Sequence, residues 1–235
     1  MGSLSFRRSP DRGPPARPLA EDELARIPCA AALDLSAPTW RGTSLEETME
    51  VLEAIRGRRT VRKFRRDPIP QAVLDEIFEA AMWAPSHANV QPWDFVMVGP
   101  EARAKLLSVF QTKADELLAT PDLPEPKRRN LTALREDFGG APTMVAVVSR
   151  PGTEPLESIE NPASTACAVQ NLSLAAWSHG IGSVWLSLGA APPAKPILGV
   201  APEASVVALL ALGQPEAVSP APPRESYRTR LRNVP

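Results

Sequence analysis

Short apolar runs alternate along this chain with longer segments whose apolar residues recur at helical spacing. The short runs predict strands, and the first of them ends at Gly99-Pro100. The expected strands are residues 93–98, 143–149, 183–188 and 205–212. No unit of about 20–50 residues repeats. The alternation therefore predicts one α-β layered domain in which helices cover a mixed sheet.

Helical signals fill the segments before and between these runs. A capping box at residues 43–47 predicts a helix over 44–56 that ends at Gly57. Pro70 can open a second helix, and helical spacing resumes over 101–118. The second helix carries an apolar stripe made of Val73, Leu74, Ile77, Phe78 and Ala81.

The longest expected helix is rich in alanine. Asn161-Pro162 has the sequence of an N-cap followed by proline at the first helical position. The segment continues through His179 and meets a terminating glycine at Gly180. The sequence therefore predicts a buried helix over 162–179.

Charge and cysteine content exclude several classes of protein. The 235 residues include 26 lysines and arginines against 27 aspartates and glutamates, so the net charge of -1 gives no global attraction to nucleic acid or to a membrane. Two cysteines and two histidines, without C-x-x-C or H-x-x-x-H spacing, predict no metal site and no disulfide scaffold. The longest apolar run, 206–212, is far below the roughly 20 residues of a membrane span. No secretory signal is recognisable, and we expect a cytoplasmic protein.

Proline is concentrated toward the two ends of the chain. Residues 1–42 are rich in proline and arginine and lack sustained periodicity, which predicts an N-terminal arm that is either flexible or wrapped around a partner subunit. The main domain is expected over 43–235. Its C-terminal tail should be extended rather than helical.

The densest charge lies in residues 56–66, where seven of eleven residues are basic and none is acidic. A solvated charge run is the usual interpretation. However, the run follows a predicted helix end and contains the hydroxyl of Thr60 among guanidinium groups, which suits a phosphate. Nucleic acid would also attract this charge, but aromatic residues are scarce there and the rest of the domain is not basic. One phosphorylated small molecule is favoured.

Two further segments carry chemistry. The loop 85–93 lies between two prolines and displays serine, histidine, asparagine and glutamine side chains, although simple turn chemistry would produce the same pattern. Gly180 and Gly182 precede Trp185 and allow either close approach of a flat ligand or close packing of helix and strand. Neither the P-loop pattern nor the dinucleotide fingerprint is present.

Taken together, these segments resemble the nitroreductase-like family of FMN-dependent oxidoreductases. The motifs that carry the resemblance are residues 58–64, 84–93, 171–172 with 180–185, and Leu212-Gly213-Gln214-Pro215. The likeness covers about residues 45–230. It implies an α+β, three-layer α-β-α fold with a mixed, mainly antiparallel sheet, and a homodimer that builds two FMN sites along its subunit interface.

The resemblance also implies roles for individual residues. One set would hold the FMN phosphate and ribityl chain: Arg58, Arg59, Thr60 and Arg62. A second set would reach the same flavin from the other subunit: Pro85, Ser86, His87 and Asn89. A third set falls where the family lays backbone against the isoalloxazine: Trp185, Leu186 and Ser187. Arg224, in the tail, matches a late arginine that contacts the phosphate.

The implied activity is reduction of an electron-poor acceptor, such as a nitroaromatic or a quinone, with NADH or NADPH by ping-pong hydride transfer. The flavin carries this chemistry, so no catalytic side chain is required. Alternatives are another reaction on the same fold (biosynthetic dehydrogenation, reductive dehalogenation or flavin breakdown), or a non-catalytic dimer that sequesters FMN. The segments expected to cover the flavin face and select the substrate, about 110–140 and 150–162, carry no readable motif.

Overall fold

The computed structural model of the chain describes residues 49–234. The predicted arm at 1–42 and the predicted start of the first helix at 44 lie outside the described residues. Helix α2 (Val51–Gly57) ends at the predicted glycine, but Met49 and Glu50 are not helical. Within residues 49–234 no helix is both long and apolar enough to span a bilayer.

Four antiparallel strands form the sheet, in the order β1-β2-β4-β3. They are β1 (Trp93–Met97), β2 (Thr143–Ser149), β3 (Gly182–Leu186) and β4 (Ser205–Gly213). An isolated parallel bridge joins Thr60 to Ser183 at the β3 edge. The sheet is therefore antiparallel with one parallel contact beside it, in agreement with a mixed, mainly antiparallel sheet.

Side chains alternate between the two faces of the central strands, as the pleat requires. Val145 and Val147 of β2 lie in one core cluster, whereas Met144 and Ala146 lie in the other. β4 divides its leucines and alanines between the same two clusters. Both faces of the sheet are therefore buried, and both need a helical cover.

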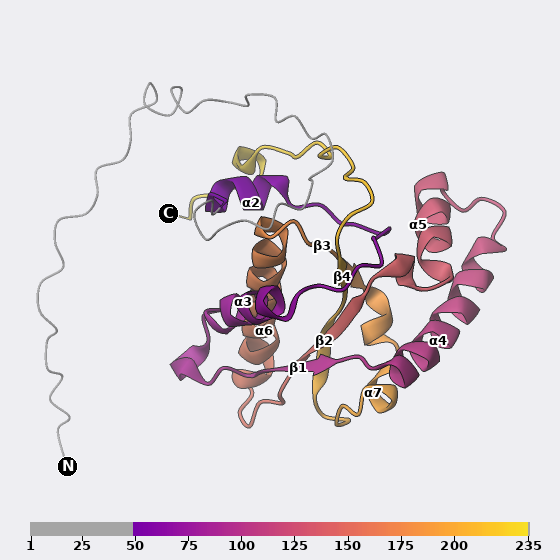
Figure 1. The fold of residues 1–235 in the computed structure, drawn as a ribbon. Coiled ribbons are helices and arrows are strands. Elements are labelled where there is room, and N and C mark those ends of the chain that lie inside the picture. The colour runs from indigo at the N-terminus through magenta and orange to yellow at the C-terminus, as the bar shows by residue number, and fades with distance from the viewer. Residues whose placement is uncertain (1–48, 235) are drawn as a thin grey trace, which may run out of the picture. The chain divides into compact units, whose positions relative to one another are not determined.

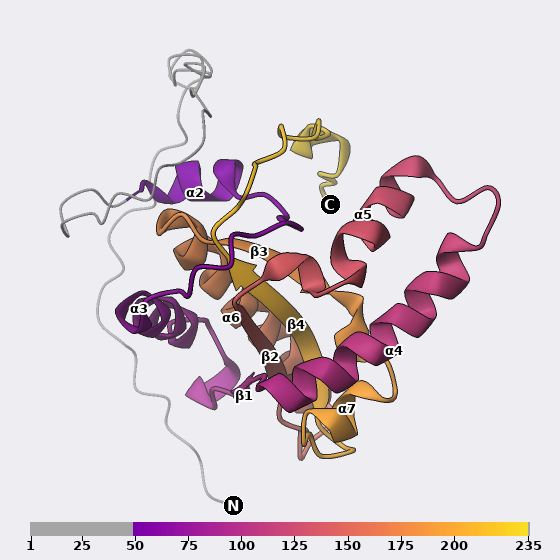
Figure 2. The same cartoon turned by 45° about the vertical axis from the view of Figure 1, so that its right-hand side comes forward.

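Helices cover the two faces and complete three layers (Figures 1 and 2). On one face lie α3 (Gln71–Met82) and α6 (Glu157–Ser178). On the other face lie α4 (Pro100–Leu118), α5 (Glu125–Arg135) and the short α7 (Ala194–Ile197). The apolar stripe predicted after Pro70 is confirmed, since Leu74, Ile77 and Ala81 are buried against α6 and the sheet.

The prediction that Asn161 caps the long helix is wrong. The helix begins at Glu157, and Pro162 lies inside it. Ser158 N–H donates to the Glu154 carbonyl (3.2 Å), and Glu160 N–H donates to the Leu156 carbonyl (3.0 Å). These bonds start the helix more than one turn before Pro162, whose missing N–H leaves the Ser158 carbonyl without its usual helical donor.

One strand prediction needs correction, and one helix was not predicted. The third strand ends at Leu186 rather than at residue 188, because Ser187–Ala190 turn into a 3-10 helix. Helix α5 falls in a segment without a readable motif. Arg128 of α5, in the basic run Lys127-Arg128-Arg129, donates to the Leu118 carbonyl (3.0 Å) and the Thr120 carbonyl (3.3 Å) at the end of α4. This arginine is therefore a structural cap and not a freely solvated charge.

Candidate functional site

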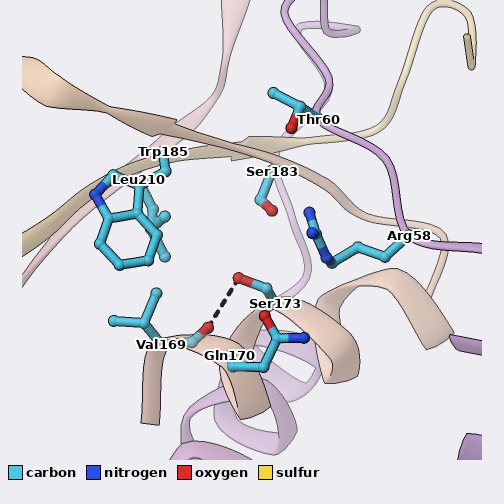
Figure 3. Close-up of a pocket in the computed structure, with 8 residues that line it drawn as sticks. All are labelled: Arg58, Thr60, Val169, Gln170, Ser173, Ser183, Trp185 and Leu210. Carbon is cyan, nitrogen blue, oxygen red and sulfur yellow. Dashed lines mark hydrogen bonds between the residues drawn. The ribbon is translucent and has the colours of Figure 1, made fainter. Parts of the chain in front are cut away.

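A cavity of about 210 Å³ lies between the α6 helix, strands β3 and β4, and the segment after α2 (Figure 3). Its polar end is formed by Arg58, Thr60, Gln170, Ser173 and Ser183. Its apolar end is formed by Val169, Trp185 and Leu210. The cavity therefore offers hydrogen-bond donors at one end and a flat apolar surface at the other.

The basic segment is held against β3 by backbone contacts. Helix α2 stops at Gly57, where an added Cβ would lie 2.9 Å from the indole nitrogen of Trp177. The chain then runs beside β3, where Val61 N–H donates to the Ser183 carbonyl (3.0 Å). Because Val61 is buried, its neighbour Thr60 is turned outward to the cavity.

Arginine side chains gather at the polar end without a carboxylate. The pKa of Arg58 lies below its ordinary value, first because the side chain is half-buried and then because Arg224 and Arg59 are close. Within residues 49–234, none of Arg58, Arg59, Arg62 and Arg224 forms an ion pair, whereas Arg66 contacts Asp137 at 2.6 Å. The structure thus brings the tail residue Arg224 to the segment after α2, and the combined charge favours an anion.

Arg59 and Arg62 differ from Arg58. Arg59 Nη1 donates to the carbonyls of Arg56 (2.6 Å) and Arg58 (2.9 Å) and so satisfies backbone oxygens at the end of α2. Its Nε is buried and has no hydrogen-bond partner in the described part of the chain. Arg62 is half-buried, which lowers its pKa, and it does not line the cavity. A buried guanidinium nitrogen without an acceptor is costly unless a ligand supplies one.

The donor set fits a phosphate monoester carried on a polar chain. Arginine forks and hydroxyl groups are suitable donors to phosphate oxygens, and no acidic side chain lines the cavity. Ser173 donates to the Val169 carbonyl (2.8 Å), whereas Ser183 and Thr60 form no side-chain hydrogen bond within residues 49–234. In the same range, no three His, Cys, Asp or Glu side chains gather closely enough to hold a metal ion.

Trp185, Leu186 and Ser187 occupy three different environments. The indole of Trp185 is 51% exposed and faces the cavity. Leu186 is buried in the core on the other side of the sheet, so only its backbone is available to a ligand. Ser187 is exposed at the start of the 3-10 helix. Of the three side chains, only that of Trp185 lines the cavity.

The glycine pair serves packing and chain reversal. Gly180 has φ +71 and follows α6, and Ile181 N–H donates back to the Ala176 carbonyl (2.8 Å), which is typical of a helix terminus. An added Cβ at Gly182 would lie 2.5 Å from Cγ2 of Val61. Close packing therefore accounts for Gly182, whereas the positive φ at the end of α6 accounts for Gly180, where an added Cβ would meet no atom within 4 Å.

The polar loop lies at the other end of α6. His87–Asn89 form one 3-10 turn, with Ala88 and Asn89 at positive φ. Ser86 Oγ accepts from the Gln91 N–H (3.1 Å), and His87 Nδ1 lies 3.1 Å from Glu160 Oε2.

One chain does not bring the loop and the cavity together. Glu160, in the first turns of α6, contacts His87, whereas Gln170 lines the cavity. At 1.5 Å per residue, these two helix positions are separated by about 15 Å along the axis. Pro85, Ser86, His87 and Asn89 are all absent from the cavity wall.

Several cavity residues escape analysis of the sequence. Val169, Gln170 and Ser173 share one side of α6, and Leu210 comes from the central strand β4. Only Ser183 lies next to a recognisable motif, because it directly follows the glycine pair. The others lie in apolar helical or strand patterns that carry no mark of a site.

The comparisons with known proteins converge. A model described as the nitroreductase family matches residues 55–214. YfhC of Bacillus subtilis strain 168, named provisionally as an NAD(P)H nitroreductase, is 35% identical over 136 residues, which are 57% of this chain and 68% of that protein. The 5,6-dimethylbenzimidazole synthase of Rhodospirillum rubrum is 32% identical over 176 residues, which are 72% of this chain and 83% of that protein. A solved nitroreductase with bound FMN from Bacteroides fragilis superposes with a TM-score of 0.57 at 28% identity, covering 80% of this chain and 100% of that chain.

Proposed function

Because the chain belongs to the nitroreductase family, we propose that it is an FMN-dependent oxidoreductase that uses NADH or NADPH to reduce an electron-poor acceptor such as a nitroaromatic or a quinone. The observation that carries the proposal is the cluster of Arg58, Arg59 and Arg224 beside a cavity without an acid. The buried and unpartnered Nε of Arg59 adds a donor in need of an acceptor.

Residues of this chain would hold the two ends of FMN differently. Arg58 and Arg224 would bind the phosphate, and the hydroxyls of Thr60 and Ser183 would donate to the phosphate or the ribityl chain. Trp185 would lie beside the ring system at the apolar end of the cavity. When bound, FMN supplies the two-electron transfer between nicotinamide and acceptor. We propose a ping-pong sequence, in which the two substrates use the same open face in turn.

The complete site, in this proposal, needs a second copy of the chain. The cavity is smaller than the roughly 300–1,000 Å³ of pockets that enclose a small ligand. The loop residues Pro85, Ser86, His87 and Asn89 lie away from it in their own chain. Exposed apolar side chains on α2 (Val51, Leu52 and Ile55) and at the start of α6 (Leu156 and Ile159) offer a surface for association. A homodimer would place the loop of one copy beside the cavity of the other.

Anaerobic spectroscopy tests the enzyme proposal. The purified protein is loaded with FMN and separated from free cofactor, and the flavin absorbance is followed during addition of NADH or NADPH and then of a nitroaromatic or quinone. We expect bleaching by one of the nicotinamides and recovery by the acceptor. Failure to retain FMN, or retention without bleaching, would contradict the proposal. The second of these results would support a flavin-sequestering dimer.

A second reaction is favoured by the likeness to a 5,6-dimethylbenzimidazole synthase. In this alternative, the same arginines would bind the reduced flavin. The protein would then break the flavin down instead of passing its electrons to an acceptor. Mass spectrometry of the small molecules after one turnover in air separates the two reactions. Intact FMN supports acceptor reduction, whereas a benzimidazole product supports flavin breakdown.

A further inference from the structure

A tight turn at residues 137–141 connects α5 to β2. Three successive residues of this turn have positive φ: Phe138 (+57), Gly139 (+75) and Gly140 (+80). Glycine adopts such angles freely, whereas a bulky aromatic residue is strained there. Phe138 is fully buried, and its ring packs against the ring of Phe110, with 5.7 Å between the centroids. Strain of this kind persists only where the surrounding contacts hold the backbone in place.

One arginine of α4 supplies the contacts that hold the turn at both ends. Arg103 donates through Nη2 to the Asp137 carbonyl and through Nη1 to the Ala141 carbonyl, both at 2.6 Å. Its guanidinium carbon also lies 5.8 Å from the centre of the Phe138 ring. Asp137 Oδ2 contacts Arg66 of the basic segment, residues 56–66, at 2.6 Å. The turn is therefore attached to α4 on one side and to the basic segment on the other.

The backbone of the turn lies directly against the backbone of the basic segment. The Phe64 N–H donates to the Gly139 carbonyl (2.8 Å), and an added Cβ at Gly139 would overlap the Arg62 carbonyl oxygen. Three residues before Phe64, the Val61 N–H donates to the Ser183 carbonyl (3.0 Å). The basic segment is therefore anchored both to β3 and to the turn that Arg103 holds.

This double anchor fixes the segment that forms part of the cavity wall. Arg58 and Thr60 line the cavity, whereas Arg103 does not. We propose that Arg103 is a positioning residue of the FMN site. By holding the 137–141 turn, it fixes the backbone of residues 60–64 and so the placement of Thr60 and Arg62 relative to Arg58. The inference rests on the proposed function, because it takes the basic segment as the part of the site that binds the FMN phosphate.

Amide hydrogen exchange of the protein without cofactor tests the contact. In Arg103→Gln, the amide of Phe64 should exchange at least about 10-fold faster, because the turn that accepts its hydrogen bond loses its support. Arg128→Gln is the matched control, since Arg128 also donates to two carbonyls, those of Leu118 and Thr120, but at the opposite end of α4. The control should leave this exchange rate within about twofold. Unchanged exchange in Arg103→Gln would overturn the proposal.

Parallel titrations with FMN and riboflavin test the role of Arg103 at the site. Riboflavin lacks the phosphate, so the ratio of the two Kd values isolates binding at the phosphate end. Arg103→Gln should raise the Kd for FMN by roughly 10-fold and leave the Kd for riboflavin within about twofold. Arg128→Gln should change neither value. Equal weakening of both ligands in Arg103→Gln would show a general loss of structure and would overturn the positioning role.

Arg103→Lys separates position from charge. Lysine keeps the positive charge but lacks the planar fork that donates to two carbonyls at once. This variant should therefore resemble Arg103→Gln, with fast exchange of the Phe64 amide and weak binding of FMN. Full FMN affinity together with fast Phe64 exchange would show that Arg103 acts through its charge alone, which would overturn the proposal.

The titrations also separate this proposal from the proposed function. If the unmodified protein binds FMN more tightly than riboflavin and Arg103→Gln keeps the same ratio, the role of Arg103 alone is overturned. If the unmodified protein does not bind FMN, or binds it no more tightly than riboflavin, the proposed phosphate site itself is contradicted, and Arg103 then supports only the fold.

Discussion

The guanidinium of Arg58 is half-buried, lies near other arginines and forms no ion pair within residues 49–234. These neighbours are Arg224 and Arg59, and no carboxylate of the described range compensates the charge of Arg58. Several arginines elsewhere pair with carboxylates, as Arg135 does with Asp115 at 2.6 Å. An unpaired cluster of this kind costs stability unless an anion binds to it, so the cost is itself an argument for the ligand.

Removal of this guanidinium should weaken FMN binding selectively. We expect Arg58→Ala to raise the Kd for FMN by roughly 10- to 100-fold, because a charge-assisted hydrogen bond contributes about 1.5–3 kcal/mol. Quenching of flavin fluorescence measures the Kd. Arg65→Ala, in the same basic run but with an exposed side chain remote from the cavity wall, is the matched control and should leave it unchanged. Equal weakening in both variants would show that general charge, and not this site, binds the cofactor.

Strand β3 and the segment after α2 approach so closely that only glycine fits between them. A Cβ at Gly182 would lie 2.5 Å from Cγ2 and 2.8 Å from Cβ of Val61. The same approach allows the Val61 N–H to reach the Ser183 carbonyl and turns Thr60 toward the cavity. Packing between two elements therefore positions the binding residues.

Gly182→Ala should lower stability by about 1–3 kcal/mol, the usual cost of overpacking. For a domain of this size, the corresponding fall in Tm is roughly 2–4 °C per kcal/mol. Thermal unfolding of the protein without FMN gives the value. The double variant Gly182→Ala with Val61→Ala should recover part of the loss relative to the sum of the single changes, since it removes Cγ2, the nearest clashing atom, while Cβ of Val61 remains. Strict additivity would contradict the proposed contact.

Helices α4 and α5 form a hairpin held by charged groups. A bidentate pair joins Arg135 to Asp115, with distances of 2.6 and 2.9 Å. The hydrogen bond from Arg135, followed by its charge, lowers the pKa of Asp115. Because the folded-state pKa lies below the unfolded one, this pair stabilises the protein above the unfolded pKa, and the contribution is lost as pH falls through the folded pKa.

Asp115→Asn should therefore lower thermal stability near pH 7 and have little further effect at an acidic pH below the lowered folded-state pKa, where Asp115 is protonated in both states. The difference should shrink in high salt, because the pair is exposed. Melting curves of the two proteins at both pH values, with and without salt, measure it. Glu116→Gln, which alters an exposed pair within α4 alone, is the control. A difference that persists at low pH would show that the amide changes packing instead.

At the scale of the whole molecule, α6 separates the two groups of candidate site residues. The loop group lies at its first turns and the arginine group near its C-terminal half, so the two groups are far apart within one chain. In a dimer with a twofold axis, the loop of each copy would lie beside the cavity of the other copy, which gives two complete sites. The exposed apolar residues of α2 and the start of α6 offer surfaces for this association.

Mixing of two defective proteins tests that arrangement. Arg58→Ala and Asn89→Ala should each bind FMN poorly as homodimers. After subunit exchange, half of the dimers should be mixed, and each should contain one unmodified site, which restores about one quarter of the FMN sites. Fluorescence titration and light scattering report sites and mass together. A monomer at assay concentration, or a mixture with no recovered sites, would contradict a site shared between subunits.

The sequence predicted those helices and strands whose hydrophobic period and flanking turn residues match the way they pack in the fold. The stripe after Pro70 and strands β2 and β4 appear where the sequence indicates them, because hydrophobic period and turn residues act locally. The prediction of a cap at Asn161 was wrong because the carbonyls of Glu154 and Leu156 accept helical hydrogen bonds that start the helix earlier in the chain. Helix α5 was not predicted, although Pro126 lies in its first turn and Leu134 packs into the core. Contacts from Arg128 and Arg135 also attach it to α4.

The sequence alone determined the layered fold, the family and the charged segments. Each of these follows from the order and spacing of residues that are close together in the chain. Only the tertiary structure decided that Arg224 lies beside Arg58, that Ser183 and one side of α6 complete the cavity wall, and that His87 faces Glu160. The physical reason is that these groups meet through sheet order and helix packing across long separations in the chain. No local spacing encodes which side chains such packing brings within a few ångströms of one another.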